Sequence, residues 1–508
     1  MADFTREEVE EKLAEIAAAL ETEEAEEEFE EEIEIIEEID DSSEDETGEE
    51  KPEAETSEEE VAAAEALESE EEQNKFPLKG CDLSGLDLSD LKFYRTDLSE
   101  TNLTGANLSG TDLSGVTLEK AILKGANLSD ANLTEAQASH ADLVQAQLED
   151  ANLESAVFSN ANLSQANLDR ANLRKSKFTE ANLTGCQLNA TSMEHAEFSK
   201  AILKGAKVVE SNLSRAKFNG ADLEEVDFSD SRLSMGVFFE AKLMRANLNR
   251  AIVKGARLVG VDFTEAKMPR ADFTSADLTE AKLLNADLTR ANLNGSILRR
   301  SRLENSNLME ANLNIADLTG ADLVKVILNG ADLGRIKLQG ARLNGAKLSK
   351  ANLKKAKLNN VELVQADLSG ANLTGADLTN ARLEGADFSR ADLSEAILEG
   401  AELKNAFLTG AVVRGANLVG VNLEGTDMAG VKLSKSDLSG ANLKGVDLRR
   451  ADLEHVNFSK ADLSQVNLTG AKLGDANLSK ANLTQANFTN ADVMDADFSG
   501  ATGYQPAA

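Results

Sequence analysis

The sequence has no tryptophan, two tyrosines, four prolines and two cysteines among its 508 residues. Aromatic residues make up only 4% of the chain, so a conventional core built on large aromatic side chains is not expected. Two cysteines do not make a disulfide framework. Neither a secretory signal nor a run of about 18 apolar residues is present. We therefore expect a soluble, cytoplasmic protein without membrane insertion.

Negative charge is concentrated at the N-terminus. The whole chain has a net charge of −38. Residues 1–75 contain 35 acidic and 4 basic residues, whereas the other 433 residues contain 55 acidic and 48 basic residues. The net charges of these two parts are thus −31 and −7, so the acidity belongs to a tail. Such tails solubilise, repel or bind basic surfaces.

The tail has an amphipathic pattern in its first 40 residues. Thr5 and Glu8 have the spacing of a capping box. Two apolar stripes follow, formed by Val9, Leu13, Ile16 and Leu20 and then by Phe29, Ile33 and Ile36. We interpret residues 1–40 as an acidic amphipathic helical segment. A helical hairpin or a dimer contact is the favoured way to bury the stripes, and docking on the end of the following domain is the alternative.

The next part of the tail lacks such stripes. Residues 41–57 contain almost no apolar side chains, which predicts a disordered acidic linker. Residues 58–75 are predicted to form a short helix that leads to the main domain.

From Leu83 to Phe498 a large apolar residue returns at every fifth position. All 84 of these central positions carry Leu, Phe, Met or Val except Ala138. A small residue, usually Ala, stands two positions before each centre. Five is neither the period of a strand nor that of a helix. Two positions in five therefore point inward, and three face water.

This pattern resembles the pentapeptide-repeat family, as in "ANLTGADLTN" (371–380) and "ANLSDANLTE" (126–135). The resemblance implies an all-β solenoid over residues 76–500, a right-handed quadrilateral β-helix with four pentapeptides in each 20-residue coil. The 84 repeats then make about 21 coils, a rod of about 100 Å. Residues 501–508 are left as a C-terminal tail.

Two patterns in the sequence favour a coil of 20 residues independently of the resemblance. Phenylalanines return at this interval, which predicts an internal ladder of Phe158, Phe178, Phe198, Phe218 and Phe238. The residues of one solvent-facing column alternate between positive and negative charge, which places opposite charges on adjacent coils. This column consists of Arg302, Asp322, Arg342, Glu362, Arg382 and Glu402.

The two ends of a β-helix are open edges that need covering. At the N-terminal end, residues 74–80 are the expected plug, together with tail helices. At the C-terminal end, two alternatives remain. Phe498 and Tyr504 form a lid, or two molecules pair end to end. A homodimer through open ends or through tail helices is therefore among the expected partners.

The sequence offers little for catalysis or cofactor binding. His140, His195 and His455 all stand at solvent-facing positions without partners, so we assign no metal site. Cys81 and Cys186 occupy small inward positions about five coils apart, which excludes a disulfide between them. No phosphate-binding loop is present. We predict no catalytic residue, no cofactor and no enzyme activity.

One basic surface differs from its surroundings. Residues 285–360 contain 13 basic and 6 acidic residues, a net charge of +7. Stacking of like charges on adjacent coils predicts an anionic-partner patch of Arg335, Lys337, Lys354, Lys355 and Lys357. Four alternatives remain for what lies against this patch. They are counterions on a solvated face, the acidic tail, another protein and nucleic acid.

These observations predict a non-catalytic protein-binding or scaffolding rod, which the acidic tail regulates or solubilises. Its protein partner is not identified, and direct nucleic-acid binding is not expected. The alternative comes from the resemblance: some family members mimic duplex DNA and bind DNA gyrase. Duplex DNA carries one negative charge per about 1.7 Å of its length. A duplex as long as the predicted rod therefore carries far more negative charge than the net −7 of the repeat-containing part of this chain. The abundance of the family in bacteria suggests a bacterial source.

Overall fold

The computed structural model describes residues 2–18, 20 and 78–504. The chain forms two compact units, Met1–Glu197 and Phe198–Ala508. The predicted linker 41–57, the helix predicted in 58–75 and the stripe of Phe29, Ile33 and Ile36 lie outside the described residues. Among those that are described, a helix covers residues 6–18 and continues at residue 20.

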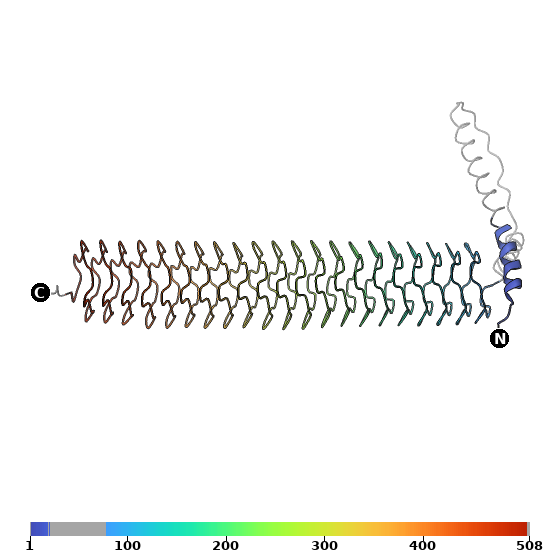
Figure 1. Ribbon diagram of the computed structural model, residues 1–508, viewed down its shortest axis with the longest axis horizontal. Helices are drawn as coiled ribbons and strands as arrows, with labels where there is room; N and C mark the ends of the chain where they lie inside the picture. Colours follow the sequence, from blue (N-terminus) through green and yellow to red (C-terminus); the bar gives the residue numbers. More distant parts are fainter. Residues whose placement is uncertain (1, 19, 21–77, 505–508) are drawn as a thin grey trace, which may run out of the picture. The chain divides into compact units, whose positions relative to one another are not determined.

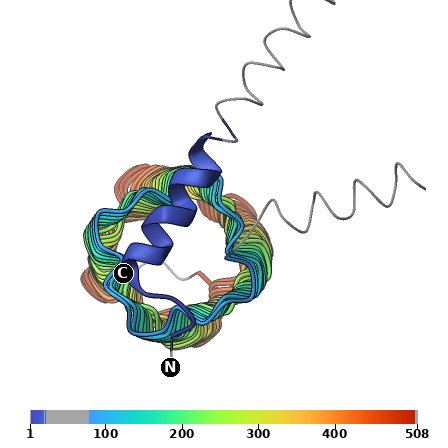
Figure 2. The same ribbon diagram turned by 90° about the vertical axis from the view of Figure 1, so that its right-hand side faces the viewer.

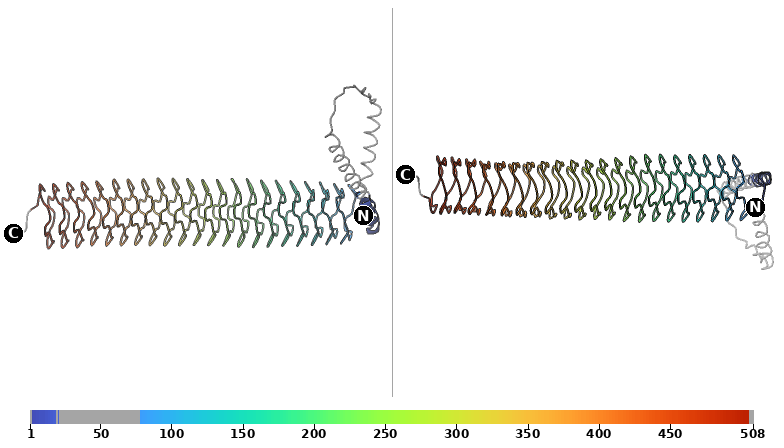
Figure 3. Two further views of the ribbon diagram at one scale, coloured as in Figure 1. Left: turned by 90° about the horizontal axis from the view of Figure 1, so that it is seen from above. Right: turned by 60° about the horizontal axis from the view of Figure 1, so that its bottom comes forward.

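Each unit contains stacked coils, as Figures 1 and 3 show. Within each unit, isolated parallel bridges join residues 20 positions apart, such as Asp82 and Asn102 in the first unit and Arg302 and Asp322 in the second. The bridge residues are single positions, running from Asp82 to Thr502 at intervals of five. The fold is a right-handed quadrilateral β-helix with four pentapeptides per coil.

Hydrogen bonds between coils follow one rule on every side. Leu103 N–H donates to the carbonyl of Ile122 (2.7 Å), and Gly105 N–H donates to that of Lys124 (2.9 Å). In return, Ile122 N–H donates to the carbonyl of Thr101 (2.9 Å). Each side therefore directs two donors and one acceptor toward the following coil, and one donor and two acceptors toward the preceding coil.

The corners require a left-handed backbone at the fifth residue of every repeat. Glycine accepts this conformation freely, as at Gly105 (φ 65°), but many corners carry other residues, such as Glu135 (φ 61°). The left-handed region costs a residue with a side chain about 1–2 kcal/mol. The bond from Glu135 N–H to the carbonyl of Glu154 (3.0 Å) offsets part of this cost.

The interior contains the central and small positions, as the sequence predicted. Central leucines such as Leu108 are fully buried. In the first unit, the rings of Phe158 and Phe178 stack with centroids 5.3 Å apart. In the second unit, Phe218 stacks on Phe198 at 5.0 Å and on Phe238 at 4.9 Å. These contacts place same-column phenylalanines one coil apart.

The N-terminal helix lies across the opening of the first coil, as Figure 2 shows. Thr5 N–H donates to the Glu8 carboxylate (2.7 Å), and Glu8 N–H donates to Thr5 Oγ1 (3.3 Å), so both halves of a capping box are present. Val9 is fully buried, and Leu13 is 9% exposed. Val9 and Leu13 thus cover the apolar end of the chain's own first coil, which is the docking that the sequence left as the alternative, whereas the second stripe of the predicted hairpin lies outside the described residues.

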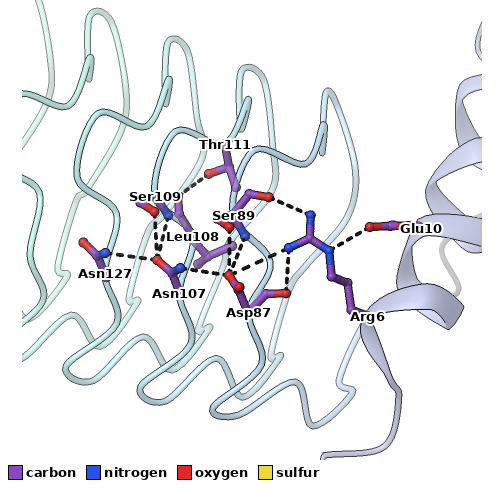
Figure 4. A network of polar contacts seen from close by, with 9 residues as sticks. All are labelled: Arg6, Glu10, Asp87, Ser89, Asn107, Leu108, Ser109, Thr111 and Asn127. Carbon is purple, nitrogen blue, oxygen red and sulfur yellow. Dashed lines mark hydrogen bonds and ion pairs between the residues drawn. The ribbon is translucent and has the colours of Figure 1, made fainter.

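Polar contacts fasten this helix to the edge of the coil, as Figure 4 shows. The Arg6 guanidinium donates to the carbonyls of Asp87 (3.2 Å) and Ser89 (3.0 Å). It also donates to Glu10 Oε1 (2.8 Å), which holds the side chain in place. Of the expected plug, residues 74–77 lie outside the description, while Leu78 is buried and Gly80 N–H donates to the carbonyl of Ser99 (2.9 Å).

An aromatic cluster lies at the C-terminal end of the second unit. Tyr504 stacks on Phe498, with ring centroids 3.8 Å apart, and meets the ring of Phe488 edge-on at 5.4 Å. This arrangement is the lid that the sequence left as one of two alternatives. Neither phenylalanine is fully buried, so apolar surface remains at this end.

Candidate protein-interaction surface

The alternating charge column on the second unit is largely neutralised by its own members. Arg342 contacts Asp322 on the preceding coil (2.6 Å) and Glu362 on the following coil (4.0 Å). Arg382 in turn contacts Glu362 (3.5 Å). Arg302 differs, because it pairs with Glu304 of its own side (2.9 Å). We call the residues from Asp322 to Glu402 of this column the paired column.

The basic residues of the predicted patch gather at one corner of two adjacent coils. Lys337 and Lys357 are direct bridge neighbours, so two like charges face each other. We call the following exposed residues the basic corner: Arg335, Lys337, Lys354, Lys355 and Lys357. Within the described part of the chain, all of them except Lys337 lack an ion pair.

Among the described residues, Asp317 is the carboxylate that forms an ion pair with this surface. Its Oδ2 lies 3.6 Å from Lys337 Nζ and accepts hydrogen bonds from the Arg299 guanidinium (2.8 and 3.0 Å). Burial opposes ionisation of Asp317, but hydrogen bonds from Thr319 and Arg299 outweigh it and lower the pKa of the carboxyl to about 2. Lys337 therefore shares the Asp317 carboxylate with Arg299.

Ile315 adds an exposed apolar group on the coil before these cations, with its side chain reaching toward Gly295. It stands one coil before Arg335 in the same corner column, since Ile315 N–H donates to Gly334 and Arg335 N–H to Lys354. Its φ is 56°, and its side chain is 49% exposed. A β-branched residue in the left-handed region is strained. An exposed apolar residue held at this cost makes the corner both basic and apolar.

Our sequence reasoning missed Ile315, although a signal was present. The fifth position of a repeat faces water and usually carries glycine or a charged residue, so isoleucine there stands out. It also missed Lys347 and Lys350, exposed lysines of the coil that carries Lys354, which form no ion pair with any described residue.

A second surface feature of this unit is an apolar hollow of about 380 Å³. It is lined by Asn219, Val237, Phe239, Arg257 and Val259, which stand at solvent-facing positions of one side on three successive coils. Phe239 is 50% exposed. The Asn219 Oδ1 atom is buried and accepts no hydrogen bond. Our sequence analysis did not single out this hollow.

The remaining candidates for chemistry are separate from both surfaces. Cys81 and Cys186 form no disulfide with each other, and burial raises the pKa of the Cys186 thiol to about 12, which makes it a poor nucleophile. His140, His195 and His455 occupy left-handed corner positions. No group of three or more potential ligands that could hold a metal ion occurs among the described residues. The same residues include no helix long and apolar enough to cross a membrane.

Comparisons with known proteins agree with this architecture. A family model described as pentapeptide repeats matches residues 81–150 and 209–500 in overlapping windows. A second model, pentapeptide repeat region, matches residues 151–228. A comparison with curated proteins gives no match.

Several solved structures share the repeat. HetL, a pentapeptide repeat protein involved in heterocyst differentiation regulation in the cyanobacterium Nostoc, is 34% identical over 46% of this chain and 89% of its own, with a TM-score of 0.19. QnrB1, a plasmid-mediated fluoroquinolone resistance protein, is 20% identical over 39% of this chain and 90% of its own, with a TM-score of 0.23. A thylakoid-lumen protein of Arabidopsis thaliana is 29% identical over 24% of this chain and 70% of its own, with a TM-score of 0.12. With these TM-scores, we infer no function from the likenesses.

Proposed function

Because the chain belongs to the pentapeptide-repeat family, we propose that it is a non-catalytic protein-binding scaffold in the cytoplasm. We assign its main contact to the basic corner, and the partner to an acidic protein segment that carries an apolar side chain. The observation that carries this proposal is that Lys337 and Lys357 are bridge neighbours and that exposed, strained Ile315 lies on the coil before them.

Electrostatics favours an acidic partner at this place. Like charges opposite each other on adjacent coils are destabilising, and no described carboxylate lies within ion-pair distance of Arg335, Lys354, Lys355 or Lys357, although Asp377 is the bridge neighbour of Lys357 on the following coil. A partner carboxylate at an exposed cation contributes about 0.2–1 kcal/mol. Several such contacts, together with burial of Ile315, add up to a specific but salt-sensitive interaction.

Direct binding to nucleic acid and DNA mimicry are less well supported. A DNA mimic needs dense negative charge, whereas residues 76–508 have a net charge of −7 and this corner is positive. Mimicry of duplex DNA toward gyrase therefore stays the alternative. A gyrase supercoiling assay with the purified chain decides it, because inhibition at micromolar concentration would support mimicry over our proposal.

Peptide binding tests the basic corner directly. The probe is a fluorescent peptide of residues 24–38, EAEEEFEEEIEIIEE, measured by fluorescence polarisation at low salt. The intact chain should bind it, and the variant K354Q/K355Q/K357Q should bind about 3-fold to about 150-fold more weakly, since three contacts of about 0.2–1 kcal/mol each are lost.

The matched control removes three exposed lysines elsewhere on the same unit, in the variant K444Q/K460Q/K480Q. It changes the net charge equally, so its affinity should stay within about twofold of that of the intact chain. Equal weakening by both triple variants would reduce the proposal to non-specific charge attraction and overturn it. Equal binding of a 20-base-pair duplex and of the peptide would favour nucleic acid.

We also propose that the acidic tail competes for this corner. The support is the net charge of −31 in residues 1–75. Deleting all 75 residues would also remove the helix that covers the first coil, so charge neutralisation is the cleaner test. Replacing every glutamate of residues 21–38 by glutamine should raise the affinity for the added peptide. Unchanged affinity would refute a competing tail.

A further inference from the structure

The two ends of this β-helix present different hydrogen-bonding groups. The hydrogen-bond rule of the coils leaves two donors and one acceptor per side facing the C-terminal end, and two acceptors and one donor facing the N-terminal end. Two ends of the same kind would therefore place donors against donors or acceptors against acceptors. Two unlike ends repeat the geometry found inside each unit.

At the C-terminal end, several of these donors have no acceptor among the described residues. Within the part of the chain that the structure describes, no partner accepts from the N–H groups of Phe488, Asn490, Val493, Asp495, Phe498 and Gly500. The central side chains of this end, Phe488, Val493 and Phe498, are only half-buried. The end therefore offers both apolar surface and free donors, and the ring of Tyr504 covers only part of it.

At the N-terminal end, the residues before the first coil take the place of a preceding coil. Asp3 N–H donates to the carbonyl of Asp82 (2.6 Å), and the Asp3 carboxylate accepts from Asp82 N–H (2.7 Å). These are the two bonds that a preceding coil makes with each bridge residue. Arg6 supplies further donors to the carbonyls of Asp87 and Ser89.

The apolar side chains of the helix also take the place of a preceding coil. Val9 and Leu13 are buried against the end of the coil, which otherwise would expose its first central leucines. The helix thus supplies apolar cover and N–H or guanidinium donors, the same groups that the C-terminal end presents.

We propose that the edge of the first coil is a docking surface for the C-terminal end of a second copy of this chain, and that the helix at residues 6–18 blocks this contact. Undocking of the helix exposes the acceptor-rich edge. Copies then associate head to tail, with Tyr504 of one copy displaced from its place over Phe498.

Removal of the helix tests the proposal. A chain that lacks residues 2–20 should form a concentration-dependent ladder of oligomers in sedimentation velocity, while the intact chain should not. Because a deletion can impair folding, a second variant, R6A/V9D, keeps the full length and should shift toward the same oligomers. Circular dichroism checks that the coils persist. The control E11A alters an exposed residue of the same helix and should behave as the intact chain.

A mixing experiment identifies which ends meet. The intact chain has a free C-terminal end and a covered N-terminal end, so an excess of it should terminate and shorten the oligomers of the deletion variant. Assembly that stops at dimers would indicate pairing of like ends and contradict the proposal. Oligomers that the intact chain does not shorten, or a deletion variant that stays monomeric at all concentrations, would also overturn it.

Discussion

The paired column and the basic corner lie on the same unit and follow the same hydrogen-bonding register, yet their charges behave oppositely. In the paired column, Arg342 has a carboxylate on the coil before and on the coil after it. In the basic corner, Lys337 faces Lys357. Because the backbone fixes which residues become neighbours, the sequence decides at each column whether these neighbours attract or repel. Columns that attract add stability, and a column that repels is available to a partner.

Removal of Asp317 should have the largest effect on the difference between the paired column and the basic corner. D317N leaves Arg299 and Lys337 without their carboxylate, so the free energy of opening of these coils should fall by about 1–3 kcal/mol. Hydrogen exchange of peptides from residues 296–340 measures this change. The same variant should bind the acidic peptide more tightly, because the corner gains a free cation. Weaker peptide binding would contradict the assigned role of the corner.

Acid should abolish the contribution of Asp317. Its pKa is lowered to about 2, so its stabilisation is fully present above the unfolded value of about 4 and is lost as the pH falls through 2. The difference in exchange between the intact chain and D317N should therefore be constant from pH 5 to 7 and shrink below pH 4. A difference that grows on acidification would be incompatible with this pKa.

Ile315 is expected to reduce stability in exchange for binding. I315G removes the left-handed strain and should stabilise its coil by about 1 kcal/mol, while the affinity for the acidic peptide should fall several-fold. M235G is the matched control, because Met235 is also exposed and left-handed (φ 60°). It should show a similar gain in stability with unchanged peptide binding. Equal affinity of both variants would show that Ile315 is not part of the contact.

The paired column can be made to resemble the corner by E362Q. This change leaves Arg382 without its contact at 3.5 Å and weakens the support of Arg342. Exposed pairs are worth little, so the loss should be about 0.5–1 kcal/mol in hydrogen exchange. E384Q, an exposed residue without an ion pair among the described residues, should change almost nothing. A similar effect of both variants would indicate that the alternation is not stabilising.

The corner can in turn be made to resemble the paired column by K357E. A carboxylate at position 357 would attract Lys337 but repel Asp377, the bridge neighbour on the following coil, so the stability should change by no more than a few tenths of a kcal/mol. Peptide affinity should nevertheless fall, since one contact becomes repulsive. Comparison of this variant with E362Q tests whether a gain in stability of one column is accompanied by a loss of peptide affinity, and the reverse.

Much of the fold could be predicted from the sequence, because the same local rule is repeated along the chain. The return of leucine every fifth residue, with a small residue two positions earlier, specifies which side chains point inward. The interval of 20 between phenylalanines specifies the coil, and Phe218 indeed stacks on Phe198 and Phe238.

Other features could not be predicted with the same certainty. The stripe of Val9 and Leu13 shows that a surface must be buried, but not against what, and the structure places these two residues at the first coil, which was the less favoured alternative. Arg302 pairs with Glu304 rather than with Asp322, because a long side chain reaches whichever carboxylate its rotamer allows. Ile315 was visible in the sequence, but its strain and exposure are properties of the corner backbone.

By itself, the sequence determined the register: which residues are inside, which are bridge neighbours and which columns repel. These follow from a period of five and a coil of 20, which each repeat imposes on the next. Only the tertiary structure decided that the N-terminal helix covers the first coil, that Asp317 serves Arg299 and Lys337 at once, and that the cations of the basic corner other than Lys337 have no described partner. Those outcomes depend on distances between groups from different repeats or from outside them, which a local repeating pattern does not contain.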